Sequence, residues 1–246
     1  MSVTSKATAA HIINRVASEV GLATTSDPYA STEDHFVQMT YLLQTCGEEL
    51  CLAYPWEFLT ESHQITTVAA TDTGDYALPA DFQYMIAQTG WEHANNVPLG
   101  GPLTPQDWTY LVGRDLSSST IYASFRLREG QFSVFPQPPP DGLDINFEYQ
   151  RRTWVSSVSS GLDVADIVVS TDVPYFDRTL ISRMLKVKFL ESKGFDTTKA
   201  QDDFNQIYGF ITGKDKSAEI VNAGGRGGSV PYLNSYRNVG DTGFGS

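Results

Sequence analysis

Residues 125–152, FRLREGQFSVFPQPPPDGLDINFEYQRR, decide the fold, because their apolar and polar side chains alternate on both sides of two different connections. Alternation before and after Glu129-Gly130 predicts a hairpin closed by a two-residue turn. Alternation starts again at Leu143 and continues to Tyr149. The stretch therefore predicts three strands of an antiparallel β region, the third reached through a longer loop.

The longer loop holds four prolines between Pro136 and Pro140 and allows two interpretations. A proline-rich ligand for a recognition domain usually lies in a flexible, polar segment. Here strand-like runs flank the prolines closely, which favours a stiff connection inside the β region. Proline has no N–H, so such a loop does not pair with a neighbouring strand edge.

Helical periodicity occurs on both sides of the β region. Apolar residues recur at helical spacing in four long segments, residues 5–22, 31–54, 172–194 and 196–220. Gly21 and Gly194 lie where helices commonly stop, and Pro55 does not continue one. Ser31 and Asp172 are the candidate N-cap residues of the second and third segments.

These patterns predict an α+β fold. Helices that are far apart in sequence must meet to bury their apolar stripes, and a four-helix bundle is the simplest arrangement that allows it. The predicted parts are the N-terminal helices of the bundle, an inserted antiparallel β domain, the C-terminal helices of the bundle and an extended glycine-rich tail. Their residues are 1–55, 56–172, 173–217 and 218–246.

The composition is that of a folded, acidic protein. Of 246 residues, 41% are hydrophobic and 19% are charged, and the formal net charge is −12. A protein that grips duplex DNA usually carries a basic face, whereas Arg151-Arg152 is the only adjacent basic pair. The first residues lack the apolar core of a signal peptide, and no run approaches the ~20 apolar residues of a membrane span. We expect a soluble protein made in a cytoplasm, with no membrane partner.

Few residue patterns indicate chemistry. Cys46 and Cys51 lie on different faces of a helical segment, and their spacing suits neither a disulfide nor a metal motif, so we predict free, packed thiols. No two of the histidines have the spacing of a metal pair, and no nucleophile elbow, phosphate loop or dinucleotide motif occurs. We therefore predict no catalytic residue, no metal and no cofactor. The histidines are His11, His35, His63 and His93.

Three stretches of the middle region carry a resemblance. Residues 54–82 place a tryptophan between a helix end and a strand, and include Tyr-x-Leu-Pro-x-Asp-Phe at 76–82. Residues 101–111 give a short tryptophan helix with Thr104 as N-cap, and residues 125–152 follow. In this order between helical segments, they resemble the head-to-tail adaptors of short-tailed bacteriophages, the tail tubular protein A type. The resemblance extends over roughly residues 8–215.

The resemblance implies a structural, non-enzymatic virion protein of the head–tail junction, assembled in the host cytoplasm. Such adaptors form a ring of about twelve copies beneath the portal protein. Their helical part packs around the ring, and their β domain faces the tail nozzle or other tail proteins. DNA passes through the central channel without being read, and an acidic chain agrees with a negative lumen along which DNA slides.

The interface predictions concern two places. The resemblance implies that the glycine-rich tail climbs onto the portal, although the tail itself matches no motif of the family. Arg151 and Arg152 are predicted to pair with acidic groups of a neighbouring subunit, the alternative being an exposed strand end. A neighbouring copy of the ring, in place of the portal, is the alternative partner for the tail. The predicted docking residues of the tail are Val230, Tyr232, Leu233, Tyr236 and Phe244.

Two other functions stay open at this point. Aromatic residues of the β region are expected to fill its core or an interface, but they can also line a sugar site. The two acids of a glycosidase need not be near in sequence. On this second hypothesis, the chain is a virion-associated carbohydrate-binding or cell-wall-degrading β domain on a helical support. A scaffold or chaperone protein outside the virion is the third hypothesis. The aromatic residues are Trp56, Trp91, Trp108, Trp154, Tyr76 and Tyr84.

Overall fold

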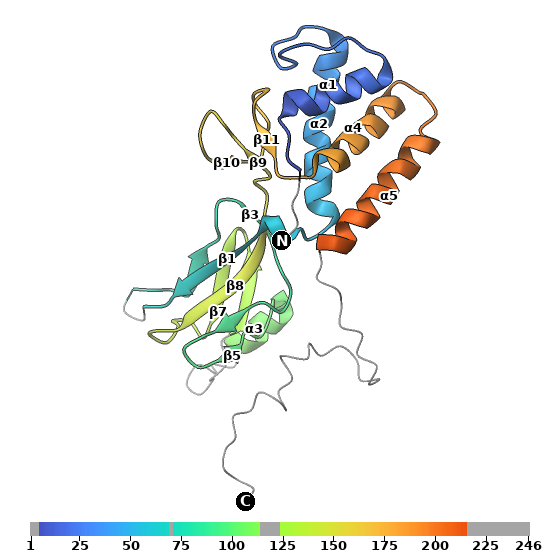
Figure 1. Ribbon diagram of the computed structural model, residues 1–246. Helices are drawn as coiled ribbons and strands as arrows, with labels where there is room; N and C mark the ends of the chain where they lie inside the picture. Colours follow the sequence, from blue (N-terminus) through green and yellow to red (C-terminus); the bar gives the residue numbers. More distant parts are fainter. Residues whose placement is uncertain (1–4, 69–70, 114–123, 216–246) are drawn as a thin grey trace, which may run out of the picture. The chain divides into compact units, whose positions relative to one another are not determined.

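The computed structural model describes residues 5–68, 71–113 and 124–215, which form one compact unit (Figure 1). These residues contain five α helices and three antiparallel sheets, so the predicted α+β class is confirmed. Four of the helices come from the two ends of the described chain, and the strands lie between them in sequence.

Helix α1, Ala9–Val20, is delimited by its capping residues. Thr8 Oγ1 accepts a hydrogen bond from the His11 N–H at 3.3 Å, so the helix begins later than residue 5. Gly21 ends it as predicted, in a left-handed conformation with a φ of 80° that a side chain would strain. The buried face consists of Ala9, Ile12, Ile13, Val16 and Ala17.

Helix α2, Asp34–Ala53, ends before Pro55 as predicted, but the prediction of Ser31 as its N-cap is wrong. Ser31 Oγ accepts a hydrogen bond from the Glu33 N–H at 3.3 Å. The hydroxyl therefore stabilises the turn that precedes the helix. Glu33 holds the N-cap position without a side-chain hydrogen bond.

Helix α4, Arg178–Ser192, begins later than predicted, and the prediction of Asp172 as its N-cap is wrong. Asp177 caps the helix by accepting a hydrogen bond from the Thr179 N–H at 2.8 Å. Burial would raise the pKa of Asp172, but backbone N–H donors hold that pKa below its ordinary value. This buried carboxylate therefore stabilises a loop instead of a helix. Its backbone donors are Val158, Val168 and Val169.

The helices share one hydrophobic core. Helix α4 contacts α1, α2 and α5, the last of which is Thr198–Asp215, and α1 contacts α2. Trp56 and Trp154 belong to the same buried cluster. Figure 1 shows these helices from both ends of the described chain lying together. Helix α5 has no fully buried residue and packs on the cluster through Phe204, Ile207, Tyr208 and Ile211.

The largest sheet is centred on strand β8. Its order is β1–β8–β4–β5, and β3 also pairs with β8. Strand β1 runs antiparallel to β8 from the Thr60–Gln150 pair to the Thr66–Asp144 pair. The strands are β1 Thr60–Thr66, β3 Phe82–Met85, β4 Trp91–Glu92, β5 Val97–Pro98 and β8 Asp144–Arg151.

A second sheet contains the predicted hairpin. Its order is β2–β7–β6, and the β6–β7 turn has positive φ values of 52° at Glu129 and 75° at Gly130. Such a turn matches the twist of the strands that it joins, and the hairpin prediction is confirmed. These strands are β2 Asp75–Ala77, β6 Ser124–Arg128 and β7 Gln131–Phe135. A third, small sheet has the order β10–β9–β11, with β9 Val155–Ser156, β10 Asp163–Val164 and β11 Val173–Pro174.

The proline-rich loop leads from β7 to β8, and these two strands belong to different sheets. Pro136 and Pro139 are buried, which a free proline-rich ligand would not allow. The loop is therefore a connection, and it carries the chain from one sheet to the other. The two sheets share a core in which the Phe132 ring stacks on Phe125 and Phe147, with ring centroids 4.8 and 4.9 Å apart.

Helix α3, Pro105–Gly113, has the predicted cap. Thr104 Oγ1 accepts a hydrogen bond from the Asp107 N–H at 3.2 Å. Trp108 is buried, and the Arg126 guanidinium lies 4.2 Å above its ring centroid. The helix is thereby fixed to β6.

Two tryptophans connect the helices to the sheets. The Trp56 indole N–H donates to Leu50 O at 2.6 Å, and Gln150 Nε2 donates to Trp56 O at 3.0 Å. Trp154 packs so closely on α2 that a Cβ added to Gly47 would lie 2.1 Å from its ring. Only glycine leaves room for this ring. A single turn of 3₁₀ helix, Glu57–Leu59, follows Trp56 and leads into β1.

Candidate interaction surfaces

Arg151 lies at the end of β8, inside an ion network of its own chain. Its guanidinium forms salt bridges with Asp163 and, at 3.3 Å, with Glu61. The Tyr175 hydroxyl donates to the second oxygen of Asp163 at 2.6 Å, and the guanidinium lies over the Tyr175 ring. Burial would raise the pKa of Asp163, but Tyr175 and Arg151 hold it below its ordinary value. The network therefore ties β8 to β1 and β10.

The two predicted inter-subunit arginines differ in their surroundings. Arg151 is 9% exposed and already paired with Asp163 of its own chain, so its charge needs no partner from another subunit. The contact of Arg151 with a neighbouring subunit stays a prediction. Arg152 is exposed, and its guanidinium donates to Ala80 O at 2.6 Å. It can therefore still reach a carboxylate of a partner. The predicted portal-docking residues Val230, Tyr232, Leu233, Tyr236 and Phe244 lie outside the described residues.

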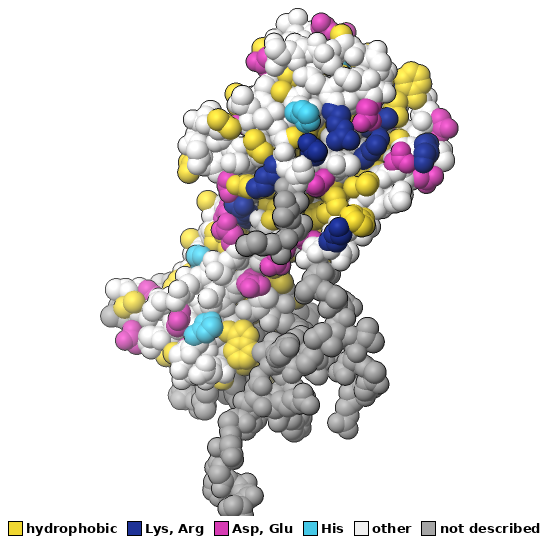
Figure 2. All heavy atoms as spheres, viewed as in Figure 1, with side chains coloured by type: hydrophobic (Ala, Val, Ile, Leu, Met, Phe, Trp, Pro, Cys, Tyr) yellow, Lys and Arg dark blue, Asp and Glu magenta, His cyan; other side chains and the backbone are white. Residues whose placement is uncertain are grey.

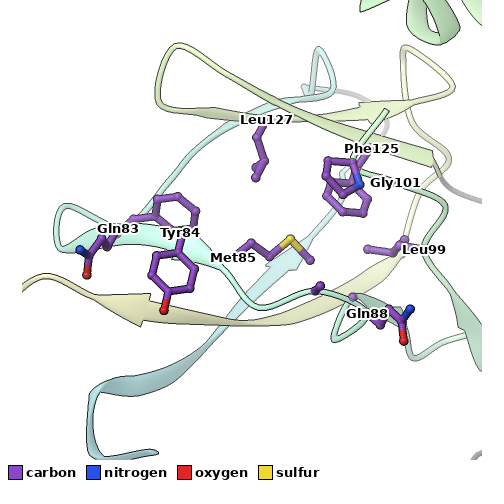
Figure 3. Close-up of a pocket in the computed structure, with 12 residues that line it drawn as sticks. Gln83, Tyr84, Met85, Gln88, Leu99, Gly101, Phe125 and Leu127 are labelled. Atoms are coloured by element: carbon purple, nitrogen blue, oxygen red, sulfur yellow. The ribbon is translucent and has the colours of Figure 1, made fainter. Parts of the chain in front are cut away.

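An apolar cavity of about 320 Å³ lies between the two larger sheets (Figure 3). Strand β3, strand β6 and parts of the segment 87–102 line it, and Figure 3 shows Met85, Leu99 and Leu127 pointing toward one another across it. None of the described residues that line the cavity is acidic or a tryptophan. The cavity thus offers apolar contact but neither the paired carboxylates nor the indole faces of a carbohydrate hydrolase.

The tryptophans themselves are mostly core residues, as predicted. Trp56 and Trp154 are at most 1% exposed in the helical core, and Trp108 is 4% exposed under α3. Trp91 is half-buried. Three of the six candidate aromatic residues are therefore core residues, Tyr76 packs against the β core, and Tyr84 lines the apolar cavity.

Two hollows flank the outer side of α2. One, of about 420 Å³, is lined by Tyr29, Val37 and Tyr41 and by the loop at Ile167; the other, of about 280 Å³, lies beside Leu52. Gln44 fastens this loop to α2, because its amide donates to Asp166 Oδ1 at 2.9 Å and accepts from the Ile167 N–H at 3.1 Å. The same amide nitrogen donates to Glu48 at 2.9 Å.

Glu92, Cys46 and Cys51 are buried titratable residues whose surroundings fix their protonation state. Glu92 is buried at 1% exposure, and burial would raise its pKa, but the N–H groups of Asn95, Asp144 and Ala94 hold that pKa below its ordinary value. Burial raises the pKa of the Cys46 and Cys51 thiols to about 12, so both stay protonated. Both cysteines are free and buried, as predicted.

Within the described ranges, no group of three or more His, Cys, Asp and Glu is placed to hold a metal ion. In the same residues, no helix is long and apolar enough to cross a bilayer. What the described surface offers instead is exposed apolar side chains, among them Tyr41, Leu52 and Val168. Val37, Tyr41 and the loop at Ile167 border one hollow, so part of this apolar surface is contiguous. Contiguous apolar surface is typical of a site of contact with another protein.

Comparison with known families also indicates a protein that functions by contact with other proteins. The chain belongs to the SU10 adaptor protein family, whose sequence model matches residues 7–220. The match covers the helices and the sheets together. Membership implies a structural phage adaptor, a component of the virion that assembles with portal and tail proteins. The prediction of a phage adaptor is therefore confirmed. The tail tubular protein A type is a narrower assignment, and the family match does not test it. Among curated proteins, none matches the chain.

Proposed function

We propose that the chain is a head-to-tail adaptor of the tail tubular protein A type in a short-tailed phage. About twelve copies form a ring between the portal and the tail nozzle, and DNA passes through its channel. The observation that carries this proposal is the adaptor-family match over residues 7–220, which leaves out neither the helical part nor the β region. The ring assembles in the host cytoplasm and functions at the head–tail junction.

The parts of the chain take different roles in this proposal. Residues 1–55 and 173–217 form a four-helix bundle that builds the wall of the ring, and the contacts of α4 with α1, α2 and α5 support it. The β domain, residues 56–172, faces the nozzle or other tail proteins. Residues 218–246 dock on the portal through Val230, Tyr232, Leu233, Tyr236 and Phe244.

The charge of the chain supports a channel that does not bind DNA. The formal net charge of −12 makes the average surface repel phosphate groups. A ring of such chains presents DNA with a lumen along which it slides, because no basic face retains it. Sequence-specific recognition is not part of this role.

Binding to the portal tests this proposal. The full chain is titrated with the purified portal complex of the same phage, and complex formation is followed by sedimentation. We expect one ring of chains per portal, and loss of binding when residues 218–246 are deleted or when Tyr232 and Tyr236 are both changed to alanine. Equal binding by the deleted chain would refute the docking role of the tail, and failure of the full chain to bind would refute the adaptor.

The carbohydrate-active alternative receives no support from the described residues. Two exposed acids that come near each other are Glu48 and Asp166, which share the Gln44 amide on the outer side of helix α2. Peptidoglycan hydrolysis that disappears in Glu48→Gln would revive it. Abundant chain in infected cells with none in particles would favour the scaffold or chaperone hypothesis.

A further inference from the structure

The outer side of α2 carries a stripe of exposed apolar side chains. Val37, Tyr41 and Leu52 are 40%, 73% and 69% exposed, and their spacing places them on one side of the helix. The opposite side of α2 contributes the buried residues of the core, Phe36, Met39, Leu43, Cys46 and Leu50 among them. Exposed apolar residues at helical spacing, away from the core, are typical of a docking surface.

The loop that Gln44 holds against α2 widens this surface. Val168 is 69% exposed in that loop, and a hollow of about 420 Å³ separates the loop from Tyr41. The two exposed acids along this surface, Glu48 and Asp166, outnumber its exposed cation Arg152, which lines the hollow beside Leu52. Helix α2 as a whole carries three acidic residues and no basic one. We call the α2 stripe and this loop the α2 surface.

Helix α4 presents the opposite charge. It carries four basic residues and one acidic residue, and one of the four, Lys188, pairs with Glu49 of α2 in the same chain at 2.8 Å. Arg183 and Lys186 are half-buried, with side chains 28% and 23% exposed, and they pair with Glu19 of α1 at 3.2 and 3.0 Å. Arg15 pairs with the same carboxylate at 3.3 Å, so three cations surround one anion. Figure 2 shows the Lys and Arg side chains gathered over this face, which we call the α4 surface.

We propose that the α2 surface of one copy binds the α4 surface of the next copy. The proposal rests on the ring of the proposed function and names the faces that close it. The two surfaces are different and carry opposite charge, so they suit a head-to-tail contact instead of a self-complementary one. Repeated around an axis, such a contact generates a ring. Tyr41 is the apolar anchor at the centre of the α2 surface, and the acids around it meet the cations of the neighbour.

Charge reversal on each surface tests the pairing. The first variant of the full chain carries Glu48→Lys and Asp166→Lys. The second carries Arg15→Glu, Glu19→Lys, Arg183→Glu and Lys186→Glu, which reverses the sign of every group in the cluster and so retains its internal ion pairs. Self-association is measured by sedimentation velocity, and circular dichroism and thermal melting check that each variant is folded.

We expect the wild-type chain to associate and each variant alone to associate at least about tenfold more weakly. An equimolar mixture of the two variants should recover association, because each then meets an opposite charge. Wild-type-like association of either variant alone would overturn the pairing; if only the second variant is unaffected, the contact is between two α2 surfaces. Two folded variants that fail to associate on mixing, or a wild-type chain that stays monomeric at its highest soluble concentration, would overturn it too.

The tyrosine anchor provides an independent check with a matched control. Tyr41→Ala should weaken association about tenfold, while Tyr110→Ala, at a 54% exposed tyrosine of α3, should leave it unchanged. Equal effects of the two substitutions would contradict the proposed surface. A ring in purified particles together with unaffected charge variants would refute only the pairing of faces, whereas particles without a ring would refute the proposed function.

Discussion

The helical part and the β region build their cores in different ways. The helical core combines α1 and α2 with α4 and α5, so it depends on contacts between the two ends of the described chain. The β core combines residues from Ile65 to Tyr149 only. A core closed by distant segments needs the insertion to bring its ends together. Trp56 follows α2 and Trp154 follows β8, and both side chains lie in the helical core. Of the described strands, β9 and β10 contribute Val155 and Val164 to the helical core, whereas strands of the other two sheets form the β core.

The largest expected effect on stability comes from removing the Trp154 side chain, which joins the segment after β8 to the helical core. Trp154→Ala empties a site in the helical core and should lower the free energy of unfolding by about 3–5 kcal/mol. Phe132→Ala, in the middle of the three stacked rings, should cost a similar amount in the β core. Urea unfolding followed by circular dichroism and by fluorescence measures both. One common transition is expected for each variant; two separate transitions would show that the cores unfold independently.

A smaller effect is expected at the glycine that makes room for the tryptophan. Gly47→Ala places a Cβ where the Trp154 ring now lies, and it should cost about 2–3 kcal/mol, because the buried ring must shift. Gly209→Ala is the matched control in α5, where an added Cβ meets nothing within 4 Å. That change should stabilise the chain by about 0.5–1 kcal/mol. Destabilisation of equal size at both glycines would contradict the packing of Trp154 on α2.

The ion network at Arg151 should have the smallest effect, and it depends on pH. Arg151→Met should cost about 1 kcal/mol at neutral pH, because it leaves Asp163 and Glu61 partly solvated but unpaired. The network lowers the pKa of Asp163 from its ordinary value of 3.8, so its stabilisation is present above that pH. It is lost as the pH falls from there through the lower pKa of the folded state. The difference between wild type and variant should therefore shrink below about pH 3.8 in denaturant titrations. A constant difference would contradict the network.

Local signals in the sequence predicted the local structure well. Gly130 readily adopts the positive φ that the predicted hairpin turn needs, and Thr104 and Gly21 cap helices through neighbouring backbone groups. Asp172 failed as a cap because its carboxylate is used by a loop that only the tertiary structure brings to it. In that case long-range hydrogen bonds override a local preference.

The surfaces were harder to predict than the cores. Arg151 pairs with Glu61, which is far away in sequence, and no spacing reveals that contact. The exposed stripe on α2 was also missed, because apolar residues at Val37, Tyr41 and Leu52 read as part of an ordinary amphipathic helix. The sequence does show one difference between the two helices, because α2 carries mainly acidic and α4 mainly basic charged residues.

The central claim is that the chain forms an adaptor ring at the head–tail junction. Imaging of purified phage particles, with the described fold fitted into the reconstruction, tests it most directly. The account predicts a closed ring of copies between portal and tail, with residues 218–246 in contact with the portal. Absence of the chain from mature particles, or single copies placed away from the junction, would contradict it.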